Sequence, residues 1–171
     1  MDLIKIDDND ITMRADAKAA VRVEEAVAST TQYTRIASNT ISGSEDAIYT
    51  LKQNELYIYN NAISFDIDYN PISFGIHVVE TGGLGLITDN SVSNNNINRR
   101  WFMGIGINES PNTELCSNSV NYLRRGIWFN QNCSPSTITL NKMTNCKYGF
   151  YMTNGAEVGA QGVSSFAHDN E

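Results

Sequence analysis

Two glutamates, Glu80 and Glu109, stand at equivalent positions in neighbouring copies of a sequence repeat. In parallel strands of adjacent copies, equivalent residues lie about 4.8 Å apart along the backbone. Like charges at that distance raise the pKa of one carboxyl group, which can turn a pair of carboxylates into an acid and a base. The separation also resembles the ~5–5.5 Å between the carboxyl groups of a retaining glycosidase. Glu80 and Glu109 are therefore candidate catalytic residues; the alternative is a solvated edge that Lys52 partly neutralises.

Aromatic side chains recur at a second equivalent position of the repeat. Its members are Arg22, Tyr49, His77, Gly106, Trp128 and Tyr151. Outward-facing rings in a row could stack on the apolar faces of sugars, so Tyr49, His77, Trp128 and Tyr151 are candidate substrate-binding residues. The same rings could instead stiffen a sheet through cross-strand contacts.

Two copies of the repeat contain longer segments, at about 64–74 and 93–103, which are expected to protrude together as loops. The second carries Arg99, Arg100 and Trp101, which we predict to bind substrate. The two arginines could grip a carboxylated or sulfated sugar. They could equally pair with Asp66 or Asp68 of the first loop.

The first of these loops also offers a weak metal motif. Asp66, Asp68 and Asn70 have the opening spacing of a calcium loop, but Pro71 stands where the glycine of the turn is expected. The sequence therefore predicts no cofactor, with calcium at these three residues as the alternative.

These candidates depend on the repeat that positions them. An asparagine recurs every 22 to 30 residues, at Asn9, Asn39, Asn61, Asn90, Asn118 and Asn141, and a small residue follows at Ala20, Ala47, Gly75, Gly104, Gly126 and Gly149. A period in this range is typical of repeat architectures. Four further positions in each copy are expected to face inward, and all of them except Thr50 are apolar.

Apolar residues alternate within each copy, as in Ile127-Trp128-Phe129, which indicates strands with one buried face. Copies stacked by parallel pairing would bury these faces together. Asparagine suits the bends because it tolerates left-handed backbone and can form amide ladders. Glycine and alanine suit a corner where the backbone is crowded or φ is positive. The predicted fold class is all-β, a parallel β-helix of about six coils.

The pattern resembles the right-handed parallel β-helix repeat of pectate-lyase-like enzymes, phage tailspikes and exported bacterial surface proteins. The resemblance covers about residues 3 to 154. The catalytic motifs of β-helix polygalacturonases, pectate lyases and alginate epimerases cannot be matched residue by residue.

The expected organisation is a β-helix over 1–154 and a tail, or the start of a following segment, over 155–171. Residues 1–33 form the first coil or an N-terminal cap, and 16–28 can be read as a strand or as an amphipathic helix. We expect the three cysteines to be small buried or semi-buried fillers, with one bridge such as Cys133–Cys146 as the alternative.

The formal net charge of −7 argues against nucleic acid and against an anionic membrane surface. No apolar run of 18 residues is present. The open first rung suggests that the sequence is part of a longer exported chain, so we expect the protein outside the cell or on its surface. The open rung also allows end-to-end or trimeric self-association.

The sequence thus favours a non-catalytic β-helix module of a larger exported bacterial surface protein, acting as a glycan-binding, adhesive or spacer region with a polysaccharide or surface glycan as partner. The alternative is a polysaccharide-degrading β-helix: a lyase, a glycoside hydrolase or a phage tailspike.

Overall fold

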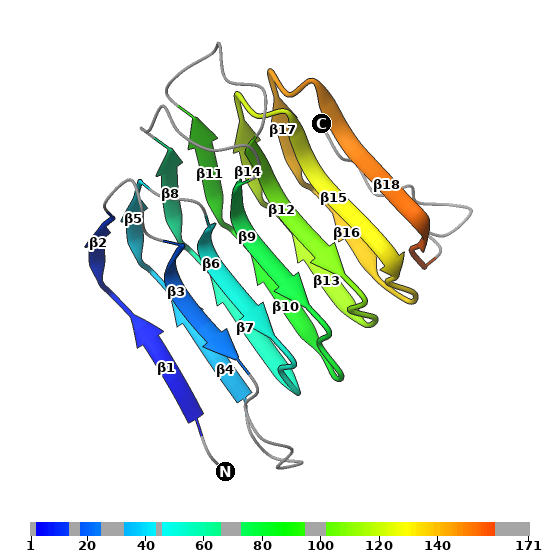
Figure 1. Cartoon of the computed structure of the whole chain (residues 1–171), viewed down its shortest axis with the longest axis horizontal. Coiled ribbons are helices and arrows are strands. Elements are labelled where there is room, and N and C mark those ends of the chain that lie inside the picture. The colour runs from blue at the N-terminus through cyan, green and yellow to red at the C-terminus, as the bar shows by residue number, and fades with distance from the viewer. Residues whose placement is uncertain are drawn as a thin grey trace.

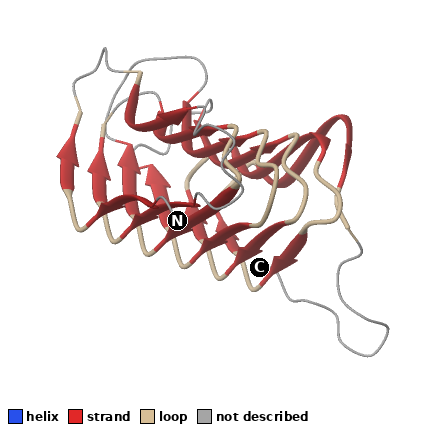
Figure 2. Ribbon diagram, turned by 90° about the horizontal axis from the view of Figure 1, so that it is seen from below, coloured by secondary structure: helices blue, strands red, loops and turns tan. Residues whose placement is uncertain are grey.

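A computed structural model describes residues 3–13, 18–24, 33–43, 46–65, 73–94 and 102–159. These residues form three parallel sheets of six strands each, and every coil contributes one strand to each sheet (Figure 1). Neighbouring strands of a sheet come from successive coils, so the chain winds around one axis, and Figure 2 shows the coils side by side along that axis.

The strands are short, because three corners interrupt each coil. Sheet A holds β1 (Leu3–Asp7), β4 (Tyr33–Ala37), β7 (Glu55–Tyr59), β10 (Gly85–Thr88), β13 (Thr113–Cys116) and β16 (Thr137–Thr139). Sheet B holds β2 (Asp10–Thr12), β5 (Thr40–Ser42), β8 (Ala62–Phe65), β11 (Ser91–Asn94), β14 (Ser119–Asn121) and β17 (Lys142–Thr144). Sheet C holds β3 (Ala19–Glu24), β6 (Asp46–Leu51), β9 (Ser73–Val79), β12 (Phe102–Asn108), β15 (Arg125–Asn132) and β18 (Tyr148–Glu157).

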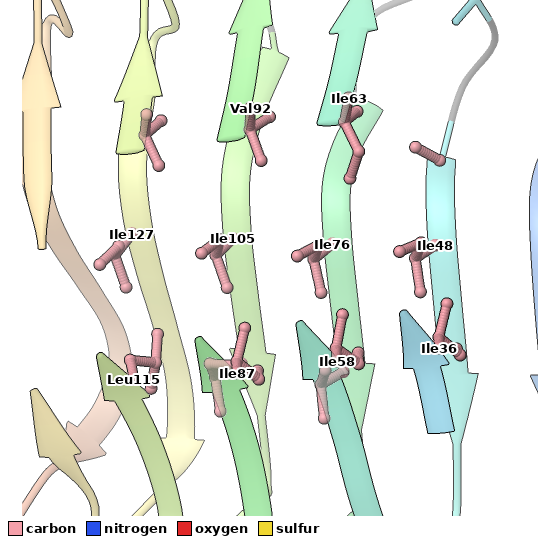
Figure 3. Close-up of a cluster of buried hydrophobic side chains, with 14 of the residues drawn as sticks. Ile36, Ile48, Ile58, Ile63, Ile76, Ile87, Val92, Ile105, Leu115 and Ile127 are labelled. Atoms are coloured by element: carbon pink, nitrogen blue, oxygen red, sulfur yellow. The ribbon is translucent and has the colours of Figure 1, made fainter. Parts of the chain in front are cut away.

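The predicted register is confirmed in all three sheets, although Phe150 and Met152 of the last coil, which were expected to be buried, are exposed. On sheet C, for example, Ile105 pairs with Ile76 on one side and with Ile127 on the other. These side chains are fully buried, and together with those of sheets A and B they form columns along the axis (Figure 3). The strand reading of 19–24 is confirmed by β3, and β18 continues to Glu157, beyond the expected boundary at 154.

The asparagine ladder lies at the corner between sheets A and B. The Nδ2 group of Asn61 donates to Oδ1 of Asn90 at 2.9 Å, and that of Asn90 donates to Oδ1 of Asn118 at 3.0 Å. In the first five coils the backbone N–H of the asparagine also donates to Oδ1 of the next asparagine, for example from Asn61 to Asn90 at 3.1 Å. Stacked amides of this kind satisfy buried polar groups that would otherwise be costly.

One expectation about this corner is wrong. The left-handed backbone conformation falls on the residue before each ladder asparagine. The described non-glycine residues with positive φ, at this corner and elsewhere, have φ of 47–60°. At this corner the left-handed residues are Asp8, Ser38, Asn60, Asp89, Ser117 and Leu140. The asparagine is therefore required for its amide and not for its backbone conformation.

At the corner between sheets B and C, crowding explains the glycines at positions 75, 104 and 126 of the column. A Cβ at Gly104 would lie 2.4 Å from Cγ1 of Val120 and 2.5 Å from the carbonyl oxygen of Gly126. The positive φ angles of described glycines fall at Gly43 and Gly155, outside this column. The column thus lets the next coil approach closely.

The three cysteines are free thiols: Cys133 is buried, and Cys116 and Cys146 are half-buried. The expected role of small buried or semi-buried filler therefore holds for all three, and the Cys133–Cys146 bridge is absent. Burial raises the pKa of the Cys133 and Cys146 thiols.

Candidate functional site

The outer face of sheet C carries the aromatic row predicted from the repeat. Strand register aligns its six members across all six coils: Arg22, Tyr49, His77, Gly106, Trp128 and Tyr151. Because each member comes from the middle of a strand in a rigid stack, its backbone position is fixed by pairing on both sides, except at the two ends.

Gly106 interrupts the row, and Phe74 fills the gap. The Phe74 ring stacks on His77 with centroids 4.1 Å apart and an interplanar angle of 15°, and it lies 5.5 Å from the Trp128 ring. A Cβ at Gly106 would come within 2.5 Å of the Phe74 ring. The glycine therefore makes room for a ring that crosses from the neighbouring strand, and the aromatic contact runs unbroken from Tyr49 to Trp128.

An acid–histidine pair lies at the N-terminal part of this face. Nδ1 of His77 is 3.6 Å from Oδ2 of Asp46, whose Oδ1 accepts a hydrogen bond of 3.0 Å from the backbone N–H of Phe74. The Tyr49 ring meets the His77 ring edge-on at 5.4 Å, and the Arg22 guanidinium lies 4.7 Å from the Tyr49 centroid.

The ionisation of Tyr49 follows from this setting. Burial raises the pKa of Tyr49, and the positive charge of Arg22 lowers it in part. The carboxylates of Glu24, Asp46 and Glu80 raise the pKa further. The phenol therefore remains protonated at neutral pH and is available as a proton donor.

Cations and tyrosines gather at the C-terminal part of the face. The Arg125 guanidinium lies 3.8 Å from the centroid of the Tyr151 ring, and Nζ of Lys147 lies 5.2 Å from that of Tyr148. The two tyrosine rings are 5.3 Å apart. Trp128 is fixed beside them, because its Nε1 donates to Oγ1 of Thr153 at 2.8 Å.

Glu80 and Glu109 occupy equivalent places in adjacent coils, as predicted, at the corner where β9 and β12 end. Both have left-handed backbone, with φ of 54° and 47°. The Glu80 N–H donates to the carbonyl of Asn108 at 2.9 Å, and that of Glu109 donates to the carbonyl of Asn130 at 3.1 Å. The two glutamates thus border the aromatic face at its edge toward sheet A, and their catalytic role stays a prediction.

Sequence reasoning missed several residues of this face: Asp46, Phe74, Met103, Arg125, Lys147 and Tyr148. Most of them stand directly before the small corner residue of their coil, as Arg125 stands before Gly126. An alignment on that position would have collected them in one column, next to the aromatic row.

The predicted loop residues Asp66, Asp68, Asn70, Arg99, Arg100 and Trp101 lie outside the described residues. Within the described part of the chain, no three His, Cys, Asp or Glu side chains gather to hold a metal ion. The described residues include no helix that is long and apolar enough to cross a membrane.

Three parallel sheets, each with one strand from every coil, define a parallel β-helix. Residues 4–164 match the family model of the right-handed β-helix region. The chain therefore belongs to the right-handed β-helix family. Comparisons with curated proteins and with solved structures found no match.

Proposed function

We propose that this chain is a non-catalytic, carbohydrate-binding β-helix module of a larger exported bacterial surface protein, and that the outer face of sheet C is its glycan-binding surface. The observation that carries the proposal is the continuous aromatic contact along this face, with cations at both ends of the aromatic row. An elongated face of this kind suits a linear polymer that lies along the stack.

Rigidity supports the same proposal. The rings contact one another and are held by strand pairing, so little side-chain freedom remains to be lost when a ligand binds. Beside them, Nδ2 of Asn130 donates to Oδ1 of Asn108, and Oγ1 of Thr153 donates to Oδ1 of Asn130. This polar column could exchange hydrogen bonds with sugar hydroxyls. The same rigid stack also suits an adhesive or spacer role at a cell surface.

The proposal is tested by binding of the 171-residue chain to a panel of soluble polysaccharides, measured by affinity electrophoresis and calorimetry. We expect one class of glycan to bind and Trp128→Ala to weaken that binding about tenfold, in line with the loss of a hot-spot aromatic side chain. Tyr57→Ala, which removes a half-buried tyrosine from the outer face of sheet A, is the matched control. Absence of binding to every glycan, or equal losses in both variants, would overturn the proposal.

One observation favours a second candidate, a polysaccharide lyase. Asp46 can orient His77 as a base that removes a proton beside a sugar carboxylate, while Tyr49 protonates the oxygen that leaves as the glycosidic bond breaks. Incubation with alginate, read by the ultraviolet absorbance of unsaturated products, decides between the two. Product that appears with the wild type and disappears with His77→Gln would establish the lyase. If the wild type forms no product, the binding module remains as the proposed function.

A further inference from the structure

The two ends of the sheet C face differ in charge. At the N-terminal end Arg22 pairs with Glu24, and Asp46 adds a second carboxylate. At the C-terminal end the described contacts of Arg125 are the Tyr151 ring and the sulfur of Met103, whose Sδ lies 3.7 Å from Nη1. Neither of these contacts carries a negative charge, so the guanidinium is not neutralised by them.

Arg125 is poised to bind a planar anion. One face of its guanidinium rests on an aromatic ring, which holds the group in a fixed plane. Its Nε is buried without a hydrogen-bond partner in the described part of the structure, so an anion from solvent would meet the guanidinium through its Nη groups. The N–H groups at the edge of a guanidinium held in this way can form paired hydrogen bonds with a carboxylate or a sulfate.

Lys147 and Tyr148 complete the cluster. Their backbone N–H groups donate to the carbonyls of Leu123 and Arg124 at 3.1 and 2.9 Å, which fixes them to the preceding coil. The Tyr148 side chain is 37% exposed, so its ring remains accessible beside Lys147. Two cations therefore bracket a pair of tyrosine rings, one of which is open to solvent.

We infer that this cluster of Arg125, Lys147, Tyr148 and Tyr151 is a subsite for an acidic sugar residue, a carboxylated or sulfated one, within the glycan-binding face proposed above. The inference rests on that proposed function. It assigns the class of the ligand and the direction in which the glycan lies along the face. The anionic group lies on Arg125 and Lys147, the sugar ring lies against Tyr148, and the chain of sugars extends from there toward Trp128 and Phe74.

The test compares matched charged and neutral polymers: alginate against carboxyl-reduced alginate, and dextran sulfate against dextran. We expect the wild-type chain to bind one of the charged polymers at least tenfold more tightly than its neutral counterpart, since hydrogen bonds to charged groups are strong. Preference within the first pair identifies a carboxylate, and preference within the second pair identifies a sulfate. Arg125→Gln and Lys147→Gln should each remove most of the preference.

Lys142→Gln is the control, because it removes one positive charge from the same coil as Lys147 but on the outer face of sheet B. Thermal melts of all three variants separate loss of binding from loss of folding. Equal binding of charged and neutral polymers would overturn this inference and leave the proposed function standing. An equal loss of preference in Lys142→Gln would also overturn it, since net charge alone would then explain the effect. Failure to bind any polymer would end both proposals.

Discussion

Single residues at the A–B corner show how backbone and side-chain requirements are divided. The position before each ladder asparagine is left-handed, and five of the six coils fill it with Asp, Ser or Asn. Asp and Asn tolerate this conformation because their short polar side chains bond locally. The last coil instead places Leu140 there, with φ of 55° and 63% of its surface exposed.

Leu140→Asn should therefore stabilise the protein. A left-handed L-residue costs about 1–2 kcal/mol, much of which asparagine avoids, so we expect a gain of about 1 kcal/mol in the free energy of unfolding. Urea denaturation measures it. Leu140→Ala removes the same exposed apolar surface without relieving the backbone, and it should give no comparable gain; equal effects of the two variants would contradict this explanation.

The contribution of Asp7 to the stability of the fold depends on pH. Burial raises its pKa, but hydrogen bonds and charge from Arg35 and Lys5 more than offset this, and the net pKa lies below the ordinary value of 3.8. Because the unfolded state then binds the proton more readily, the ion pairs stabilise the fold above that value and lose their effect as pH falls through the lowered pKa.

Asp7→Asn should accordingly reduce stability by about 1 kcal/mol at pH 7, the upper range for ion pairs near a surface. The difference from wild type should shrink as the pH is lowered below the ordinary value of 3.8. Denaturation curves across pH measure the trend, with Asp10→Asn as a control for loss of one charge in the same coil. A difference that does not change with pH would show that Asp7 acts through packing instead.

At the scale of elements, the repeat and the period-two alternation predicted the four inward columns and the aromatic row, because parallel stacking copies one coil onto the next. The basic end of the face escaped this reasoning. Counting in steps of two from inward Ile127 places Gly126 outward and Arg125 inward. In the structure Gly126 closes a crowded corner against Met143, so the alternation slips by one and Arg125 faces outward.

Thr50 is the polar member of an otherwise apolar inward column. It is fully buried on β6, between Val23 and Val78, and its hydroxyl has no hydrogen-bond partner in the described structure. Thr50→Val keeps the shape and removes the unsatisfied group, so we expect a gain of about 1 kcal/mol in thermal or denaturant unfolding.

Thr34→Val is the matched control for Thr50. Thr34 is also buried, on β4 of sheet A, but its hydroxyl donates to Oε1 of Gln53 at 2.6 Å. Its replacement leaves Gln53 without that partner and should destabilise by about 1–2 kcal/mol. Opposite signs for the two substitutions are the expected result, and a loss of stability in Thr50→Val would refute the reading of Thr50.

The amide ladder links elements of successive coils. Nδ2 of Asn90 donates to Asn118 and to the carbonyls of Ile58 and Thr88, and its Oδ1 accepts from Asn61. Asn90→Ala leaves several of these buried partners unsatisfied, so we expect a loss of about 3 kcal/mol in the free energy of unfolding. Asn121→Ala, on the outer face of sheet B, should cost far less. Similar losses in both would mean that the ladder contributes little.

The whole molecule is a one-dimensional stack, in which each coil contacts only its neighbours and stability is approximately a sum of coil and interface terms. A buried charge should therefore have an effect that depends on its place along the axis. Ile105 is fully buried in the fourth coil, whereas Ile6 of the first coil is only partly buried. Ile105→Asp should cost several kcal/mol and unfold the middle coils, because an unpaired charge would be enclosed on both sides.

Ile6→Asp should instead disturb the first coil and spare the rest. Hydrogen exchange read by mass spectrometry distinguishes the two cases, since each peptide reports on its own coil. We expect Ile6→Asp to remove protection from β1 to β3 while β9 and β12 keep theirs, and Ile105→Asp to remove it from β9, β12 and β15 together. If Ile6→Asp exposes all six coils at once, the stack unfolds as a single cooperative unit, and the effects of substitutions in it cannot be added coil by coil.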